Sequence, residues 1–253
     1  MKIFVLSHRA KLPAAAVLTA LLIVLGLTAP PHAATVSGSA DGLLPVYEVA
    51  TAENAVAISV DASWGAEYTP LILDILDEYG AHATFFLVNI WLASYPDMAR
   101  EIALRGQEIG MHSATHPHFS HLTEEQMREE LTANRQLVLD TTGYTPRLFR
   151  PPFGDYDGRV VELVHEMGCE CVQWSVDSLD WQDLGAQEIY RRVTADIHGG
   201  DIVLFHNNGL HTAEALPLIL ECFKQKGLRA VSVSELLPEG DTFVDSNGVQ
   251  HCK

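Results

Sequence analysis

Short apolar runs alternate with longer amphipathic segments along most of the chain, and this alternation limits the fold more than any other feature. The apolar runs have the length of buried strands, and the longer segments repeat apolar residues at helical spacing. Strands are expected at 55–61, 82–88, 108–111, 147–150, 170–174, 201–206 and 229–233. Helices are expected at 67–79, 96–105, 123–141, 157–167, 186–198 and 212–227.

Several helices also carry recognisable end signals. Thr123 followed by Gln126 is a capping-box pattern. Four glycines come just after the helices that they would end: Gly80, Gly143, Gly168 and Gly227. Seven strands alternating with helices predict an α/β fold with a parallel sheet, either closed as an irregular β/α barrel or left open and doubly wound. In both cases functional groups belong at the carboxyl ends of the strands.

The first 34 residues have the pattern of a secretory signal. Lys2, Arg9 and Lys11 precede an apolar run at 12–28, and the sequence HAA follows. The run approaches the length that spans a bilayer, so an uncleaved N-terminal anchor is the alternative. Both place the rest of the protein outside the cytosol, secreted or membrane-anchored. We divide that rest into a linker at 35–52, a single domain at 53–237 and a polar C-terminal tail at 238–253.

The charge balance excludes one class of partner. The formal net charge is −17, and it becomes −20 when residues 1–34, with three basic and no acidic side chains, are removed. Nucleic acids and anionic membranes are bound largely through Lys and Arg, so neither fits this chain. A neutral or cationic substrate fits better, and we expect a monomer that meets a membrane only through the possible anchor.

The four cysteines lack the spacing of a metal site. Cys169 and Cys171 alternate on one expected strand, Cys222 lies on a helix and Cys252 lies in the tail. Two alternatives are open: a disulfide between Cys222 and Cys252, or buried free thiols.

Ionisable and aromatic residues stand at the ends of five expected strands. They are Asp61 with Trp64, His112 with His116, Arg150, Asp180 with Trp181, and His206. Each also has a structural explanation: Asp61 could cap a helix, Arg150 and Asp180 could form an ion pair, Trp64 and Trp181 could pack in the core or rim, and His206 could be a core histidine. If all of these structural explanations held, unrelated residues would have to lie at the same edge of the sheet by chance.

Four histidines crowd the segment after the third strand. His112 and His116 are four residues apart, which on one helical turn would place both imidazoles on the same side, a spacing that suits a divalent metal. Pro117 would end such a turn. The alternative is a solvated, histidine-rich loop, and we expect His118 and His121 to be peripheral in either case.

Five sequence elements carry a resemblance: VDASWG, HSATH, RPPFG, WSVDSLDW and IVLFHN, in that order. The set resembles the polysaccharide deacetylase family, also called the NodB-homology domain or carbohydrate esterase family 4, over roughly residues 53–237. The resemblance implies a distorted (β/α)7 barrel. It also implies hydrolysis of acetamide groups on N-acetylated sugar polymers with a bound divalent metal, usually zinc.

The resemblance also implies roles for individual residues. His112 and His116 would be metal ligands, and Asp61 would be the general base, kept ionised by Arg150. His206 would be the general acid, supported by Asp180. The remaining positions concern substrate: the backbone N–H of Phe153 would stabilise the oxyanion, and Trp181, Leu204 and Trp64 would line the pocket.

The chain departs from the family pattern twice. Ala62 stands where most members have a second acid, so the usual metal-ligand carboxylate is missing; this D-x-S-W-G form resembles a branch that includes sporulation-associated members. Asn207 and Asn208 follow His206, where Asp is common. Three functions therefore stay open: a metal-dependent deacetylase acting on an extracellular glycan such as peptidoglycan, a deacetylase-fold glycan binder with reduced or lost catalysis, and another metal-dependent C–N hydrolase acting on a small molecule.

Overall fold

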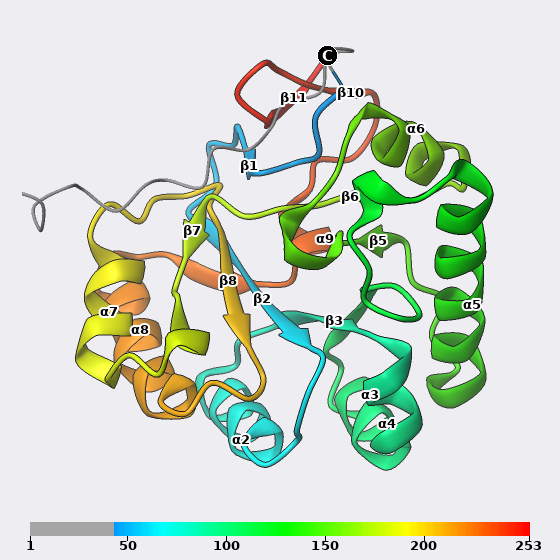
Figure 1. Cartoon of the computed structure of the whole chain (residues 1–253). Coiled ribbons are helices and arrows are strands. Elements are labelled where there is room, and N and C mark those ends of the chain that lie inside the picture. Colours follow the sequence, from blue (N-terminus) through cyan, green and yellow to red (C-terminus); the bar gives the residue numbers. More distant parts are fainter. Residues whose placement is uncertain (1–42) are drawn as a thin grey trace, which may run out of the picture. The chain divides into compact units, whose positions relative to one another are not determined.

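Parallel strands form the centre of the protein in the computed structural model, which describes residues 43–253 (Figure 1). Their order is β6-β5-β4-β3-β2-β8-β7, and β9 pairs with the first residues of β2. The strands are β2 Ala55–Ala62, β3 Ala83–Leu87, β4 Glu108–Met111, β5 Leu148–Phe149, β6 Glu170–Cys171, β7 Val176–Asp177, β8 Ile202–His206 and β9 Arg229–Val231. Every strand expected from the sequence is therefore present.

One extended stretch, 170–177, joins the two edges of this sheet. Its first part, β6, pairs with β5, and its last part, β7, pairs with β8. Between them, Gln173 N donates to Val46 O (2.7 Å) and Ser175 N donates to Ile202 O (3.0 Å). The sheet therefore curls into the distorted barrel that the resemblance implied. The strand expected at 170–174 is present as β6, whereas β7 lies beyond those bounds and was not expected.

Helices cover the outside of the strands (Figure 1). They are α2 Thr69–Tyr79, α3 Asn89–Ser94, α4 Pro96–Leu104, α5 Glu124–Thr142, α6 Gly158–Glu166, α7 Ala186–Thr194, α8 Thr212–Gln225 and α9 Val233–Leu236, with 3₁₀ turns at Phe119–His121, Pro152–Gly154 and Asp180–Gln182. The capping box of Thr123 and Gln126 is confirmed, and Gly143 ends α5 in the left-handed conformation. The short helices α3 and α9 were not expected.

Strand β2 separates two apolar layers by simple alternation. Val56, Ile58 and Ala62 belong to the large cluster between the sheet and the helices. Ala55 and Ala57 belong to the cluster inside the barrel. Asp61 follows in the second series, so its side chain lies on the inner face, whereas Ala62 lies on the outer face.

Two segments that the sequence analysis left outside the domain carry strands. β1, Glu48–Val49, lies in the expected linker, and β10, Thr242–Val244, and β11, Val249–Cys252, lie in the expected tail. They form a separate sheet in which β11 pairs with both β1 and β10. The tail is therefore a β-hairpin attached to β1 and not a plain surface extension.

The cysteines of the described residues are free thiols, so the disulfide considered between Cys222 and Cys252 is wrong. Cys169 and Cys171 are buried.

The expected signal or anchor segment, 1–34, lies outside the described residues. Across residues 43–253, no helix is long and apolar enough to cross a membrane.

Candidate active site

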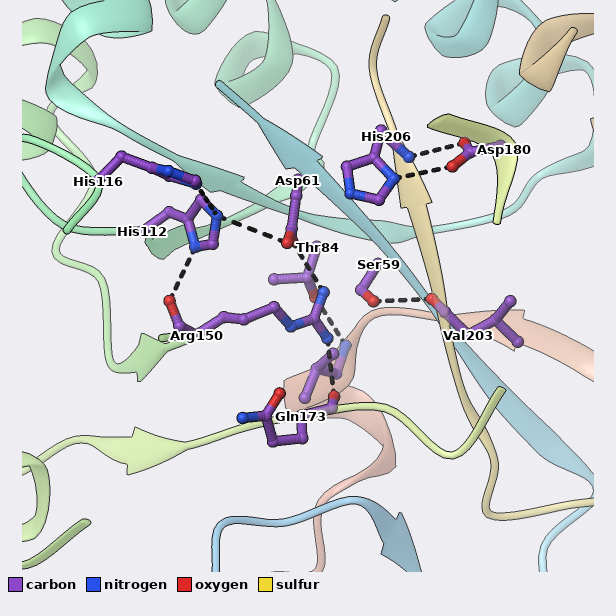
Figure 2. A network of polar contacts seen from close by, with 11 residues as sticks. Ser59, Asp61, Thr84, His112, His116, Arg150, Gln173, Asp180, Val203 and His206 are labelled. Atoms are coloured by element: carbon purple, nitrogen blue, oxygen red, sulfur yellow. Dashed lines mark hydrogen bonds and ion pairs between the residues drawn. The ribbon is translucent and has the colours of Figure 1, made fainter. Parts of the chain in front are cut away.

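Asp61 and His206 are neighbours at the carboxyl ends of β2 and β8. The two residues are direct partners in the register of these parallel strands. Figure 2 shows Asp61 between His112 on one side and His206 on the other. The helix that follows Asp61 begins after Tyr68, so the cap role considered for Asp61 is wrong.

A fully buried arginine holds the Asp61 carboxylate. Arg150 Nη1 donates to Asp61 Oδ1 (2.9 Å), and Arg150 Nη2 donates to Gln173 O (2.8 Å). The guanidinium also lies 4.3 Å from the centroid of the Phe86 ring. Burial alone would raise the pKa of Asp61, but the charges of Arg150, His112 and His206 lower it below its ordinary value. Asp61 is therefore ionised at neutral pH, the state in which a carboxylate can accept a proton.

The second charged pair joins Asp180 to His206. Asp180 Oδ1 accepts from His206 Nδ1 (2.8 Å), and Asp180 Oδ2 accepts from His206 N (2.8 Å) and from Thr212 Oγ1 (2.6 Å). Burial lowers the pKa of His206, but the hydrogen bond and charge of Asp180 raise it above its ordinary value. Arg150 and Asp180 thus have different partners, and the direct ion pair considered between them is wrong.

His112 and His116 turn their Nε2 atoms toward each other, 3.3 Å apart. His112 Nδ1 donates to Arg150 O (2.8 Å). In the neutral imidazole the proton is then on Nδ1, so His112 Nε2 has a free lone pair that can bind a metal ion. A tetrahedral zinc ion with bonds of about 2.0–2.1 Å would separate two nitrogen ligands by about 3.4 Å. Burial lowers the pKa of His112 and takes that of His116 to about 4, so both are neutral, as ligands must be. The two imidazoles therefore fit a shared metal ion.

The loop between these histidines is not the helical turn that we expected. Ser113 and His116 have positive φ angles of 74° and 60°. His116 N donates to Ser113 Oγ (2.9 Å), and the Glu130 carboxylate accepts the two backbone N–H groups in between (2.8 Å each). Hydrogen bonds to a tight turn, not the period of a helix, therefore bring the imidazoles together.

A third ligand from position 62 is absent, because Ala62 is an apolar side chain buried on the outer face of β2. Asp61 Oδ2 lies 3.5 Å from His112 Nε2, so one carboxylate stands beside the histidine pair. A separate group of Glu48, His198 and Asp201 could also hold a metal ion. It lies at the opposite end of β8 from His206 and does not include the expected ligands.

The expected pocket residues divide into exposed and buried ones. Trp64, Phe153 and Trp181 are each more than half exposed, so core packing of the two tryptophans is excluded. Leu204 is buried and precedes His206 by two residues on β8, so the two side chains share a face of that strand. Phe153 has a positive φ of 60°, which is uncommon for an aromatic residue and fixes the direction of its backbone N–H.

Sequence reasoning missed several polar residues that support the site. Asn134 is fully buried on α5; its Oδ1 accepts from His112 N (3.0 Å) and its Nδ2 donates to Leu87 O (3.0 Å). The sequence did hold a signal for Asn134, because an amide residue there stands among the apolar residues of the buried face of α5. Asn207, which the sequence marked only as a departure from the family pattern, is also buried. Its Nδ2 donates to Gly65 O (2.8 Å) in the loop after Asp61.

Comparison with known proteins tests the resemblance. Residues 48–172 match the family described as polysaccharide deacetylase. A peptidoglycan-N-acetylglucosamine deacetylase of Bacillus cereus is 34% identical, with 76% of this chain and 92% of that protein covered. The chain belongs to the polysaccharide deacetylase family.

Two further proteins are similar to this chain over comparable lengths. The uncharacterized protein YlxY of Bacillus subtilis is 34% identical over 77% of this chain, which spans 61% of that protein and so less than two thirds of it. BA3943 of Bacillus anthracis, described as a CE4 family pseudoenzyme, has a TM-score of 0.75 and 32% identity, covering 78% of this chain and 69% of that one. A mutant of BA3943 is described as having restored enzymatic activity.

Proposed function

We propose that this protein removes acetyl groups from an N-acetylated extracellular glycan, with peptidoglycan as the substrate. One observation carries the proposal: a carboxylate and an imidazole, Asp61 and His206, are in register on adjacent strands, each beside a partner of opposite charge. Relatives named peptidoglycan deacetylases support the choice of substrate. The negative net charge suits a neutral glycan that becomes cationic when it loses acetyl groups.

In the proposed reaction, Asp61 accepts the proton of the water that attacks the acetamide carbonyl. The Phe153 N–H donates to the carbonyl oxygen as negative charge develops there. His206, protonated because of Asp180, then gives its proton to the sugar nitrogen as the C–N bond breaks and acetate leaves. A divalent metal, with zinc as the first choice, would be held by His112 and His116 together with water or an unassigned third ligand. It would supply Lewis-acid polarisation of the carbonyl.

A second candidate function is glycan binding with reduced or lost catalysis. Ala62 favours it, because two imidazoles alone rarely make a tight metal site. The likeness to BA3943, a protein described as a pseudoenzyme, favours it as well. The retained Asp61–Arg150 and Asp180–His206 pairs favour the enzyme, since a binder has no use for an acid and a base.

Acetate release separates these functions. The exported domain, supplied with zinc, is incubated with peptidoglycan and with N-acetylglucosamine oligomers, with and without a chelator. We expect release that the chelator suppresses and that Asp61→Asn or His206→Ala lowers by about a hundredfold or more, while the circular dichroism spectrum is unchanged. Glycan binding without acetate release at any zinc concentration would establish the second function. A fully active Asp61→Asn variant would reject the assignment of the base.

A further inference from the structure

A second group of potential metal ligands lies at the amino end of β8. Glu48 belongs to β1, His198 belongs to the loop before β8, and Asp201 directly precedes the strand. One donor atom of each residue lies within 4.8 Å of the other two. The length of β8, about 16 Å of extended chain, separates Asp201 from His206 at the candidate active site. We call Glu48, His198 and Asp201 the β1–β8 cluster.

The imidazole of the β1–β8 cluster faces both carboxylates. His198 Nδ1 lies 3.4 Å from Asp201 Oδ2 and 4.0 Å from Glu48 Oε1. Ligands of a tetrahedral zinc ion are about 3.4 Å apart, so Asp201 is already at that spacing. Glu48 is a flexible, partly exposed side chain that reaches it by moving about half an ångström. Gly199 O, 3.3 Å from the same nitrogen, adds an oxygen donor.

The surrounding structure holds these donors in place. Asp201 is buried, its Oδ1 accepts from Ser175 Oγ (2.7 Å), and its Oδ2 accepts from His198 N (2.8 Å). The loop also lies directly against β1: Val49 N donates to Gly200 O (3.0 Å), and a side chain at Gly200 would collide with Val49 O. Hydrogen-bonded carboxylates on a fixed backbone are typical of metal sites.

The charges of the cluster favour a cation. Within residues 43–253, neither Glu48 nor Asp201 forms an ion pair with Lys or Arg, and the partner of both is the His198 imidazole. The cluster lines an open cleft of about 400 Å³ that also contains Asp177, Asp196 and a single arginine. Carboxylates taken out of water need a compensating positive charge, and the cleft gives a hydrated ion access to them.

We propose that Glu48, His198 and Asp201 bind a divalent metal ion of the zinc class, which ties β1 to the barrel. An imidazole combined with two carboxylates suits zinc better than calcium or magnesium, which prefer oxygen ligands alone. Glu48 lies on the strand that pairs with β11 of the small sheet, whereas Asp201 begins β8, so one ion would hold both sheets. This site is separate from the candidate active site, and the inference does not rest on the proposed function.

Zinc stoichiometry tests the site. Equilibrium dialysis followed by elemental analysis measures the zinc bound by the exported chain, residues 35–253, and by His116→Ala, His198→Asn and the double variant. We expect His198→Asn to remove about one zinc ion per chain from the wild type and also from His116→Ala, in which the candidate active site has lost a ligand.

Thermal stability tests the tie between β1 and the barrel. Zinc should raise the Tm of the wild type and of His116→Ala by several degrees, and that of His198→Asn by much less, because an ion that binds only the folded state stabilises it. The side chain of His198 is 59% exposed, so His198→Asn should fold normally and, with a chelator present, melt close to the wild type. Calorimetric scans with zinc and with the chelator measure both effects.

His82 offers a matched control. Its Nδ1 lies 2.9 Å from Glu235 Oε1 and its side chain is 52% exposed, so it is a similarly exposed histidine with one carboxylate instead of two. His82→Asn should leave both the zinc count and the zinc-induced rise in Tm unchanged.

The other outcomes would each overturn the inference. A zinc count that His198→Asn does not lower would make the imidazole an ion-pair partner of the two carboxylates and nothing more. Equal losses in His82→Asn and His198→Asn would mean that zinc binds surface histidines in general. A loss of zinc that leaves the rise in Tm intact would refute the tie between β1 and the barrel. Because no measurement uses turnover, each failure leaves the proposed function in place.

Discussion

At the scale of single residues, the site depends on opposite pKa shifts of two neighbouring groups: the pKa of Asp61 is lowered and that of His206 is raised. Burial would neutralise both Asp61 and His206, yet each has a partner of opposite charge that reverses this effect. The partners are themselves held: Arg150 by the Gln173 carbonyl, and Asp180 by Thr212. A change in either supporting hydrogen bond should therefore be visible in the titration of the reacting group.

Thr212→Val tests this support for His206, the proposed acid. The substitution keeps the shape but removes the hydroxyl that donates to Asp180 Oδ2 (2.6 Å). With one donor lost, Asp180 is held less firmly in hydrogen-bonding position beside the imidazole, so the raised pKa of His206 should fall. The basic limb of the activity profile should move to lower pH by the same amount, and an NMR titration of the His206 ring should report it even without turnover.

Thr212→Ser keeps a hydroxyl and serves as the control, with wild-type titration expected. Asp180→Asn should move the basic limb further in the same direction and lower maximal turnover. An unchanged His206 titration in Thr212→Val would mean that the hydroxyl only anchors the start of α8.

At the scale of elements, alternation along β2 decides which residues meet. Because Asp61 faces the barrel interior, Ala62 faces the helices. A carboxylate at position 62 therefore enters an apolar layer unless the end of β2 rotates toward the histidines. The strand is regular through Ala62, which pairs with Leu87 of β3.

Ala62→Asp should consequently make the stability of the protein depend on bound metal. Without metal, the buried carboxylate should lower the free energy of unfolding by about 1–3 kcal/mol, and Tm by several degrees. Zinc should then raise the Tm of this variant more than that of the wild type, because a third ligand tightens binding to the folded state. Differential scanning calorimetry with and without zinc measures both effects.

Ala62→Asn buries a polar group of nearly the same shape without the charge, and it should lose stability without gaining a larger zinc response. Equal zinc responses in all three proteins would show that a side chain at position 62 does not reach the metal ion.

Most elements were predictable from the sequence because their signals are local. The apolar run of β8 and the capping box of α5 needed no knowledge of distant residues. The division of 170–177 between β5 and β8 depends on partners far away in the chain, and the two-residue β1 has too little pattern to detect. The histidine turn was also beyond reach, because a positive φ at Ser113 has no sequence signal when the residue is not glycine or asparagine.

At the scale of the whole molecule, a charge of −17 should affect what happens after the reaction. Deacetylation converts a neutral sugar into a cationic amine, which an acidic protein attracts. We expect the glucosamine tetrasaccharide to bind more tightly than its N-acetylated form at low salt. That advantage should vanish near 1 M salt, where the Debye length is about 3 Å.

Calorimetry at two salt concentrations measures this difference, with the acetylated tetrasaccharide as the salt-insensitive control. A salt dependence shared equally by both sugars would mean that the net charge does not act on the product.

The pairing of β1 with β11 also sets an order of events during synthesis. Glu48 and Val49 leave the ribosome early, but their partners Val249 and Gln250 follow only after the whole barrel. Closing so long a loop is costly in chain entropy, and such distant pairings form slowly. The small sheet therefore cannot form until the barrel strands have been made, and a chain truncated before Val249 would leave the open edge of β1 free to pair with other molecules.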